Sequence, residues 1–191
     1  ARSMITRIQA GGAVDTSFNP GTGANDTILN AALQPDGKII IAGLFSRFNG
    51  VLKSRLARVN ADGSLDTTFD VGTGVSTNGV ISSIVVQPNG RIVLGGLFTS
   101  FNGHATNNLV RLNPDGTVDT SVVSGLGSPE FIRSMLLTTG EELAIGGVFA
   151  GYGGVPRDNI AKLKIDDPTG TVFDYDGDGR TDFSVFRPSS G

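Results

Sequence analysis

The stretch LQPDGKIIIAGLFSRFNG, Leu33 to Gly50, decides the fold because it is repeated along the chain. It returns as VQPNGRIVLGGLFTSFNG, Val86 to Gly103, and more loosely as LTTGEELAIGGVFAGYGG, Leu137 to Gly154. Self-similarity with a period of about 50 residues is typical of a repeat architecture. The sequence therefore predicts a row of similar structural units.

A second block follows each copy of the first. Its copies are RLARVNADGSLDTTF (55–69), NLVRLNPDGTVDTSV (108–122) and a version stretched by insertion, NIAKLKIDDPTGTVF (159–173). The same block stands near the start as MITRIQAGGAVDTSF (4–18), without a preceding copy of the first block. We interpret the sequence as beginning halfway through a repeat.

The apolar runs within each repeat have the length of β-strands. Residues 28–33, 39–42 and 56–59 are bounded by PDGK, FNG and ADGS, in which Asp-Gly and Asn-Gly supply the positive φ angles of tight hairpins. The run IIIAG is apolar throughout, which predicts a strand covered on both faces. Each repeat is therefore predicted to form four antiparallel strands, and units of this size are the blades of β-propellers.

The predicted fold class is all-β, a β-propeller-type array of four-stranded antiparallel blades with three full repeats and an N-terminal half-blade. We expect the half-blade at 4–18 and the repeats at about 19–69, 70–122 and 123–173, so that residues 1–173 form the array. Residues 174–191 remain for an acidic loop and a C-terminal strand.

These motifs carry a resemblance to a known family. FNPGTG, QPDGK, FNG and RLARVNADGSLDTTF resemble the delta-60 repeat, a propeller-type repeat of bacterial extracellular and cell-surface proteins. The resemblance covers about residues 4–173, and in the third copy QPDGK is replaced by TTGEE and FNG by YGG. Because no activity belongs to the repeat itself, the resemblance implies a scaffold with an extracellular or cell-surface location.

Composition restricts the class of partner. The net charge is -3, and the 15 Lys and Arg residues are scattered, which argues against nucleic acid as a partner. No run approaches the roughly 18 apolar residues that span a bilayer, so we expect no membrane insertion. The sequence has no cysteine, which excludes disulfides and thiolate metal sites within it.

The C-terminal stretch FDYDGDGRTDFSVF has the spacing of a calcium loop. Asp174, Asp176, Asp178 and Asp182 occupy positions 1, 3, 5 and 9, and the backbone carbonyl of Arg180 stands at position 7. Position 12 is Val185 rather than glutamate, and a strand is predicted to follow, so this is not an EF-hand. Four converging carboxylates without a cation would repel one another, and we predict that these five residues bind Ca²⁺.

This loop carries a second resemblance. DYDGDGRTDFSVFRP is similar to the calcium loop of FG-GAP or VCBS-type repeats, which are themselves propeller blade motifs of extracellular proteins. We expect the ion to order the C-terminal tail and to present the strand 183–186 for pairing.

A basic residue in the third strand recurs eight positions before an aspartate. The pairs are Arg7 with Asp15, Arg58 with Asp66, and Arg111 with Asp119. With a hairpin turn centred between them, the two side chains face each other across the ladder. We predict cross-strand ion pairs with a structural role, which contribute little stability if they are exposed.

The sequence raises three other functional interpretations: sugar binding, a role for the single histidine, and catalysis. The aromatic residues Phe45, Phe48, Phe98 and Phe101 of F-x-x-FNG, together with Tyr152, would stack on sugar rings in a carbohydrate-binding module, although packing between blades is favoured. The single histidine, His104, has no partner for catalysis or metal binding and is expected at an exposed turn. Carboxylates gathered at the propeller mouth would be needed for an enzyme, and we predict that the protein is not one.

The incomplete blade at the N-terminus raises the question of closure. An open row of blades exposes sheet edges and apolar faces at its ends. One solution is a four-bladed ring within one chain, a second is complementation between subunits, and a third is that the sequence is part of a longer array. We favour complementation, and therefore expect a homo-oligomer or polymer. The predicted function is that of a secreted or cell-surface structural or adhesive protein, with a surface glycan or protein as its external ligand.

Overall fold

The computed structural model describes residues 4–121, 130–138, 142–152, 155–156 and 158–164. These residues form strands and turns and contain no helix. The protein is thus all-β, as predicted. Its strands form three three-stranded antiparallel sheets and three short hairpins.

Each three-stranded sheet comes from one repeat, with the same topology each time. The first sheet has the order β1-β2-β5, the second β6-β7-β10 and the third β11-β12-β15. Their strands are β1 (Ile28–Leu33), β2 (Ile39–Gly43), β5 (Leu56–Val59), β6 (Val80–Val86), β7 (Ile92–Leu97), β10 (Leu109–Leu112), β11 (Ile132–Leu137), β12 (Glu142–Gly147) and β15 (Ile160–Lys164).

A short hairpin lies between the second and third strands of each repeat, and each of its two strands has two residues. The FNG motif forms its turn in the first two repeats, where Asn49 and Asn102 have φ angles of 50° and 46°. The hairpin strands are β3 (Arg47–Phe48), β4 (Val51–Leu52), β8 (Ser100–Phe101), β9 (His104–Ala105), β13 (Gly151–Tyr152) and β14 (Val155–Pro156).

The predicted fourth strand is shorter than expected. In the first two repeats it consists of a single bridge, Val59 with Leu65 and Leu112 with Val118. The chain turns away directly afterwards because the next residue, an aspartate, accepts a hydrogen bond from a backbone amide two positions on, at 2.9 Å from Thr68 to Asp66. The fourth strand of the third repeat lies outside the described residues.

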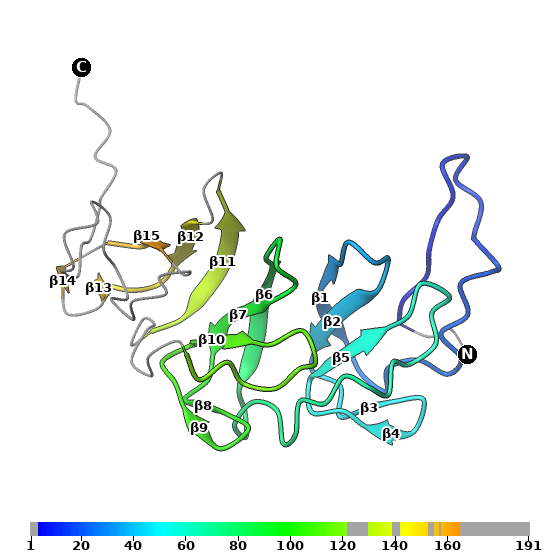
Figure 1. Cartoon of the computed structure of the whole chain (residues 1–191), viewed down its shortest axis with the longest axis horizontal. Coiled ribbons are helices and arrows are strands. Elements are labelled where there is room, and N and C mark those ends of the chain that lie inside the picture. Colours follow the sequence, from blue (N-terminus) through cyan, green and yellow to red (C-terminus); the bar gives the residue numbers. More distant parts are fainter. Residues whose placement is uncertain (1–3, 122–129, 139–141, 153–154, 157, 165–191) are drawn as a thin grey trace.

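The sheets follow one another in a row in chain order (Figure 1). Strand β6 contacts both β1 and β11, so the first strands of successive sheets are neighbours. The N-terminal segment, residues 4–18, contributes one bridge between Ile8 and Val14 and lies beside the first sheet. This segment corresponds to the predicted half-blade.

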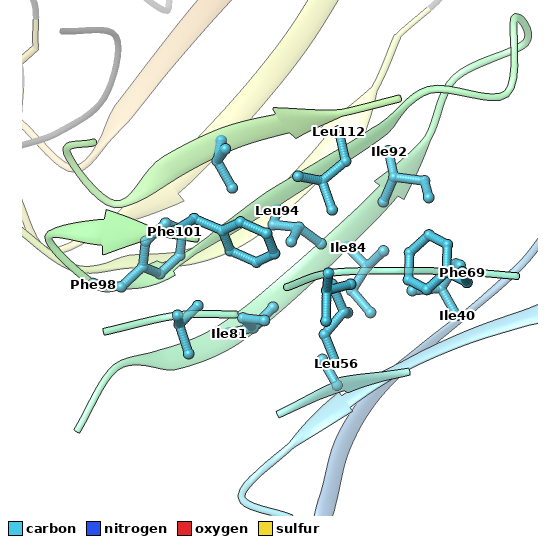
Figure 2. Packing of buried hydrophobic residues seen from close by; sticks show 14 residues of the cluster. Ile40, Leu56, Phe69, Ile81, Ile84, Ile92, Leu94, Phe98, Phe101 and Leu112 are labelled. Carbon is cyan, nitrogen blue, oxygen red and sulfur yellow. The ribbon is translucent and has the colours of Figure 1, made fainter. Parts of the chain in front are cut away.

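The hydrophobic core lies between the sheets. Figure 2 shows the cluster between the first and second sheets, where Ile40 and Leu56 meet Ile84 and Leu94. On the other face of β2, Ile41 joins Phe18 of the N-terminal segment in a second cluster. A third cluster joins the second and third sheets. The second strand of the repeat is therefore covered on both faces, as its uniformly apolar sequence predicted.

One glycine of the repeated motif is required by a backbone contact. Each first strand contains a register shift near its beginning, between Ile28 and Asn30 in β1. At this point the carbonyl oxygen of Thr27 lies where a Cβ atom on Gly43 would be. Gly96 and Gly147 meet the carbonyls of Val80 and Phe131 in the same way, which explains the glycine at this position of the second strand in all three repeats.

Candidate functional site

The predicted arginine–aspartate pairs form in all three places. Arg7 Nε donates to Asp15 Oδ2 at 2.7 Å, Arg58 Nε to Asp66 Oδ2 at 2.8 Å, and Arg111 Nε to Asp119 Oδ2 at 2.9 Å. In each pair the aspartate backbone amide also donates to the arginine carbonyl, so the two residues are directly opposite. The register predicted from the hairpin turn is confirmed.

The two pairs within the sheets are buried, which the sequence did not indicate. The side chains of Arg58 and Asp66 are 8% and 5% exposed, whereas that of Arg7 is 40% exposed. The buried guanidinium contacts both the following repeat and the phenylalanine at the end of its own repeat. Arg58 Nη1 donates to the carbonyl of Pro114 at 2.6 Å, and its guanidinium lies 4.6 Å from the ring centre of Phe69.

A second cation joins each buried aspartate. Lys38 Nζ lies 2.8 Å from Asp66 Oδ2, and Arg91 Nε lies 3.1 Å from Asp119 Oδ2. These cations come from the first residue after the PDG or PNG turn. We call each buried aspartate with its two cations a charge cassette; the first consists of Lys38, Arg58 and Asp66, and the second of Arg91, Arg111 and Asp119.

The third repeat also has an ion pair between its second and third strands, but here the second strand carries the acid instead of a cation. Glu142 stands where the first two repeats have Lys38 and Arg91, and it forms an ion pair with Lys162. Lys162 in turn occupies the position of Arg58 and Arg111. An acid on the second strand thus neutralises the cation of the third strand in this repeat.

The cassette aspartates are held ionised. Burial alone would raise the pKa of Asp66, but hydrogen bonds from Lys38, Thr68 and Arg58 outweigh it and lower the pKa. For Asp119, burial is likewise outweighed by hydrogen bonds from Ser121 and by the charges of Arg111 and Arg91, so its pKa is also lowered. A general acid needs a raised pKa and an accessible proton, so these carboxylates are suited to a structural role.

The FNG hairpin clasps the loop that precedes its own sheet. Asn49 Oδ1 accepts a hydrogen bond from the Gly23 amide at 2.9 Å, and Asn102 Oδ1 accepts one from the Thr73 amide at 3.1 Å. The G-T-G segments are therefore turns bound by the asparagine. No helix follows either segment in the described residues, so the arrangement of a phosphate-binding loop is lacking there.

The aromatic residues of F-x-x-FNG pack between sheets, as the favoured interpretation predicted. Phe45, Phe48 and Phe101 have no exposed surface, and Phe98 is 2% exposed. Because sugar stacking needs an accessible ring face, these residues do not form a glycan-binding surface. The side chain of Tyr152 lies outside the described residues. His104 is exposed in β9, next to the turn where it was expected.

A shallow groove of about 330 Å³ lies where the first strands end. Its lining is apolar apart from two glutamine side chains and contains no titratable group; the residues are Leu33, Gln34, Pro35, Val86, Gln87, Pro88 and Leu137. The groove therefore offers no acid or base for catalysis.

The predicted calcium ligands Asp174, Asp176, Asp178, Arg180 and Asp182 lie outside the described residues. Within the described residues no group of three or more His, Cys, Asp or Glu side chains is arranged to hold a metal ion. The calcium prediction therefore stays a prediction. The part of the chain that the structure describes also contains no helix of the length and hydropathy that a bilayer crossing needs.

Comparison with known families supports the fold. Residues 34–69 and 87–121 each match the model of a beta-propeller family, described as a domain of unknown function (DUF5122). The two matches begin at Gln34 and Gln87 of the QP motif, and each extends through a hairpin and a charge cassette. These segments are therefore similar to β-propeller repeats. No curated protein and no solved structure matched the chain.

Proposed function

We propose that this protein is a secreted or cell-surface structural or adhesive protein of bacterial origin that assembles with copies of itself. The observation that carries the proposal is the open face of the first sheet: Leu29 and Leu33 of β1 are 48% and 71% exposed, whereas Ile84 on the matching face of β6 is 8% exposed. Each interface between successive sheets buries apolar side chains from both partners, and residues 4–18 present only part of such a partner to the first sheet. A heterologous surface that needs completion favours rings or filaments of identical subunits.

The absence of an activity from the delta-60 repeat, which the motifs resemble, supports a scaffold role rather than an enzymatic one. Asp66 and Asp119 are buried and ion-paired and their pKa values are lowered, which suits a structural role better than proton transfer. An external protein or glycan is the proposed ligand of the assembled surface. Glycan-array binding that survives disassembly would instead identify a lectin acting as a single subunit.

Calcium is the proposed stabilising ion of the C-terminal loop. The donor set fits it, since four carboxylates and a backbone carbonyl are hard oxygen ligands, and many oxygen ligands from the protein suit Ca²⁺ better than Mg²⁺. The loop residues that would hold the ion are Asp174, Asp176, Asp178, Arg180 and Asp182. We expect the chelator EGTA to lower the melting temperature, and added calcium to restore it.

Size-exclusion chromatography with light scattering, with and without calcium, tests the assembly. We expect particles of more than one chain in calcium and smaller ones in EGTA. A strictly monomeric protein at every concentration and in both conditions would contradict the proposed self-assembly. A melting temperature that is unchanged by EGTA, with no heat of calcium binding, would contradict the calcium site.

A further inference from the structure

One face of β1 is open, although the same face is covered in the later sheets. Leu29 and Leu33 are 48% and 71% exposed, and Ala31 between them is exposed as well. The corresponding positions of β6 are Ser82, Ile84 and Val86, of which Ile84 is only 8% exposed. The three repeats thus provide an internal comparison for this face.

The preceding sheet covers this face in β6 and β11. Ile84 packs in the cluster shared with Ile40 of the first sheet (Figure 2). In β11, Met135 and Leu137 pack against the cluster that contains Val85 of the second sheet. The N-terminal segment has counterparts of β5 and the following bridge, but not of the first two strands that would cover β1.

The contacts between β1 and β6 show what a strand that covers the open face of β1 must provide. Ala32 of β1 packs against the shared cluster, and Asn30 Nδ2 donates to the carbonyl of Ser82 at 3.0 Å. These two residues alternate with the exposed ones along β1, so they point to its opposite face. The occupant of the open face must therefore be a strand with an apolar residue at the position of Ala32.

The sequence of residues 183–188, FSVFRP, has this pattern. Pro188 aligns with Pro35, which lies two residues after the end of β1. In this alignment Val185 takes the place of Ala32, and Phe183 that of Asn30. Residues 183–188 lie outside the described residues, so the assignment rests on their sequence and on the open face.

We propose that the segment 183–188 of a second copy of this chain docks on the open face of β1, with Val185 and Phe183 packed over Leu29, Ala31 and Leu33. This inference rests on the proposed self-assembly and names its interface. A second copy is chosen because the first and third sheets lie at opposite ends of the row, separated by the second sheet (Figure 1). Addition of a strand from the next copy at each β1 gives head-to-tail assembly.

Cross-linking of the full chain tests which copy supplies the strand. Because the sequence lacks cysteine, an Ala31→Cys, Val185→Cys variant carries only the two intended thiols. We expect a short bismaleimide to produce covalent dimers and longer ladders on a denaturing gel. The matched control is Leu52→Cys with Val185→Cys, since Leu52 is 65% exposed but lies in β4, and it should give no ladder.

The other cross-linking outcomes overturn the proposal. A cross-link confined to single chains, identified by mass spectrometry, would mean that the tail closes on its own β1. A ladder equally strong with the Leu52→Cys control would mean contact by collision. Failure of both pairs to react while the unmodified protein remains oligomeric would leave self-assembly standing and reject this interface.

A charge substitution provides a second test that does not depend on cross-linking chemistry. Leu33→Asp places a carboxylate at the open face and should raise the dissociation constant of assembly about tenfold or more, because binding would bury an unpaired charge. Leu52→Asp, similarly exposed, should leave assembly unchanged. Both variants should keep the wild-type circular dichroism spectrum, and equal oligomer distributions for the two would overturn the proposal.

Discussion

Removal of the Asp66 carboxylate should strongly destabilise the first two sheets. Its Oδ2 atom accepts hydrogen bonds from Arg58 Nε and Lys38 Nζ, both at 2.8 Å, and its Oδ1 atom accepts from the amide and hydroxyl of Thr68. In Asp66→Ala, the Arg58 guanidinium keeps the Pro114 carbonyl and the Phe69 ring but loses its counter-charge. A cation whose side chain is only 8% exposed would then remain unneutralised.

The expected loss follows from this burial. Breaking a buried ion pair by removal of one partner costs about 3–5 kcal/mol, and a domain has a total unfolding free energy of only about 5–15 kcal/mol. Asp15→Ala is the matched control, because Asp15 has the equivalent partners in the N-terminal segment, Arg7 and the hydroxyl of Ser17 in place of Thr68. Its arginine is 40% exposed and can be solvated, so the loss should be clearly smaller.

Urea unfolding followed by circular dichroism at pH 7 measures both losses, with the free energy taken from the midpoint and the slope. A third variant, Arg58→Met with Asp66→Leu, removes both charges and should recover part of the stability lost in Asp66→Ala. Equal losses in Asp66→Ala and Asp15→Ala, or a loss below about 1 kcal/mol in Asp66→Ala, would refute the assignment of a buried, charge-neutral cassette.

Three further predictions concern acid, a loop glycine and an aromatic residue. Because the pKa of Asp66 is lowered on folding, its contribution is complete above the unfolded-state pKa of about 3.9 and is lost as the pH falls through the folded-state pKa. Urea midpoints between pH 7 and pH 2 should therefore fall less steeply in Asp66→Asn than in the wild type, and identical pH profiles would contradict this. Gly72→Ala should destabilise more than Gly103→Ala in the same urea assay: both positions have positive φ angles, of 56° and 77°, but only at Gly72 does the new methyl group overlap the Asn102 side chain. Equal losses would show that the Asn102 side chain can move away from the new methyl group with no loss of stability. Phe101→Ala should lose about 3–5 kcal/mol because it empties a fully buried site between sheets, whereas a ring used for sugar stacking would be lost at little cost in stability.

Much of the local structure could be predicted from the sequence. The repeated Asp-Gly and Asn-Gly turns fix hairpin lengths, and hairpin length fixes which residues are opposite, so the Arg58–Asp66 register followed from spacing alone. The uniformly apolar IIIAG run correctly indicated a strand covered on both faces. The buried packing role of Phe48 and Phe101 was also the favoured prediction.

Other features depended on contacts between residues that are distant in the sequence. Arg58 contacts the Pro114 turn of the following repeat, and the participation of Lys38 depends on the second strand lying beside the third, which pairs with the fourth on its other edge. The ion pair between Glu142 and Lys162, which the sequence alone did not indicate, depends on the pairing of β12 with β15.

The sequence by itself determined the period, the turns and the strand register, because these depend on backbone preferences and on alternation over a few residues. The tertiary structure decided which ion pairs are buried, how far the fourth strand extends and which face of β1 stays open. The physical reason is that burial is a property of two surfaces in contact. A single repeat specifies only one of them, and the neighbouring repeat supplies the other.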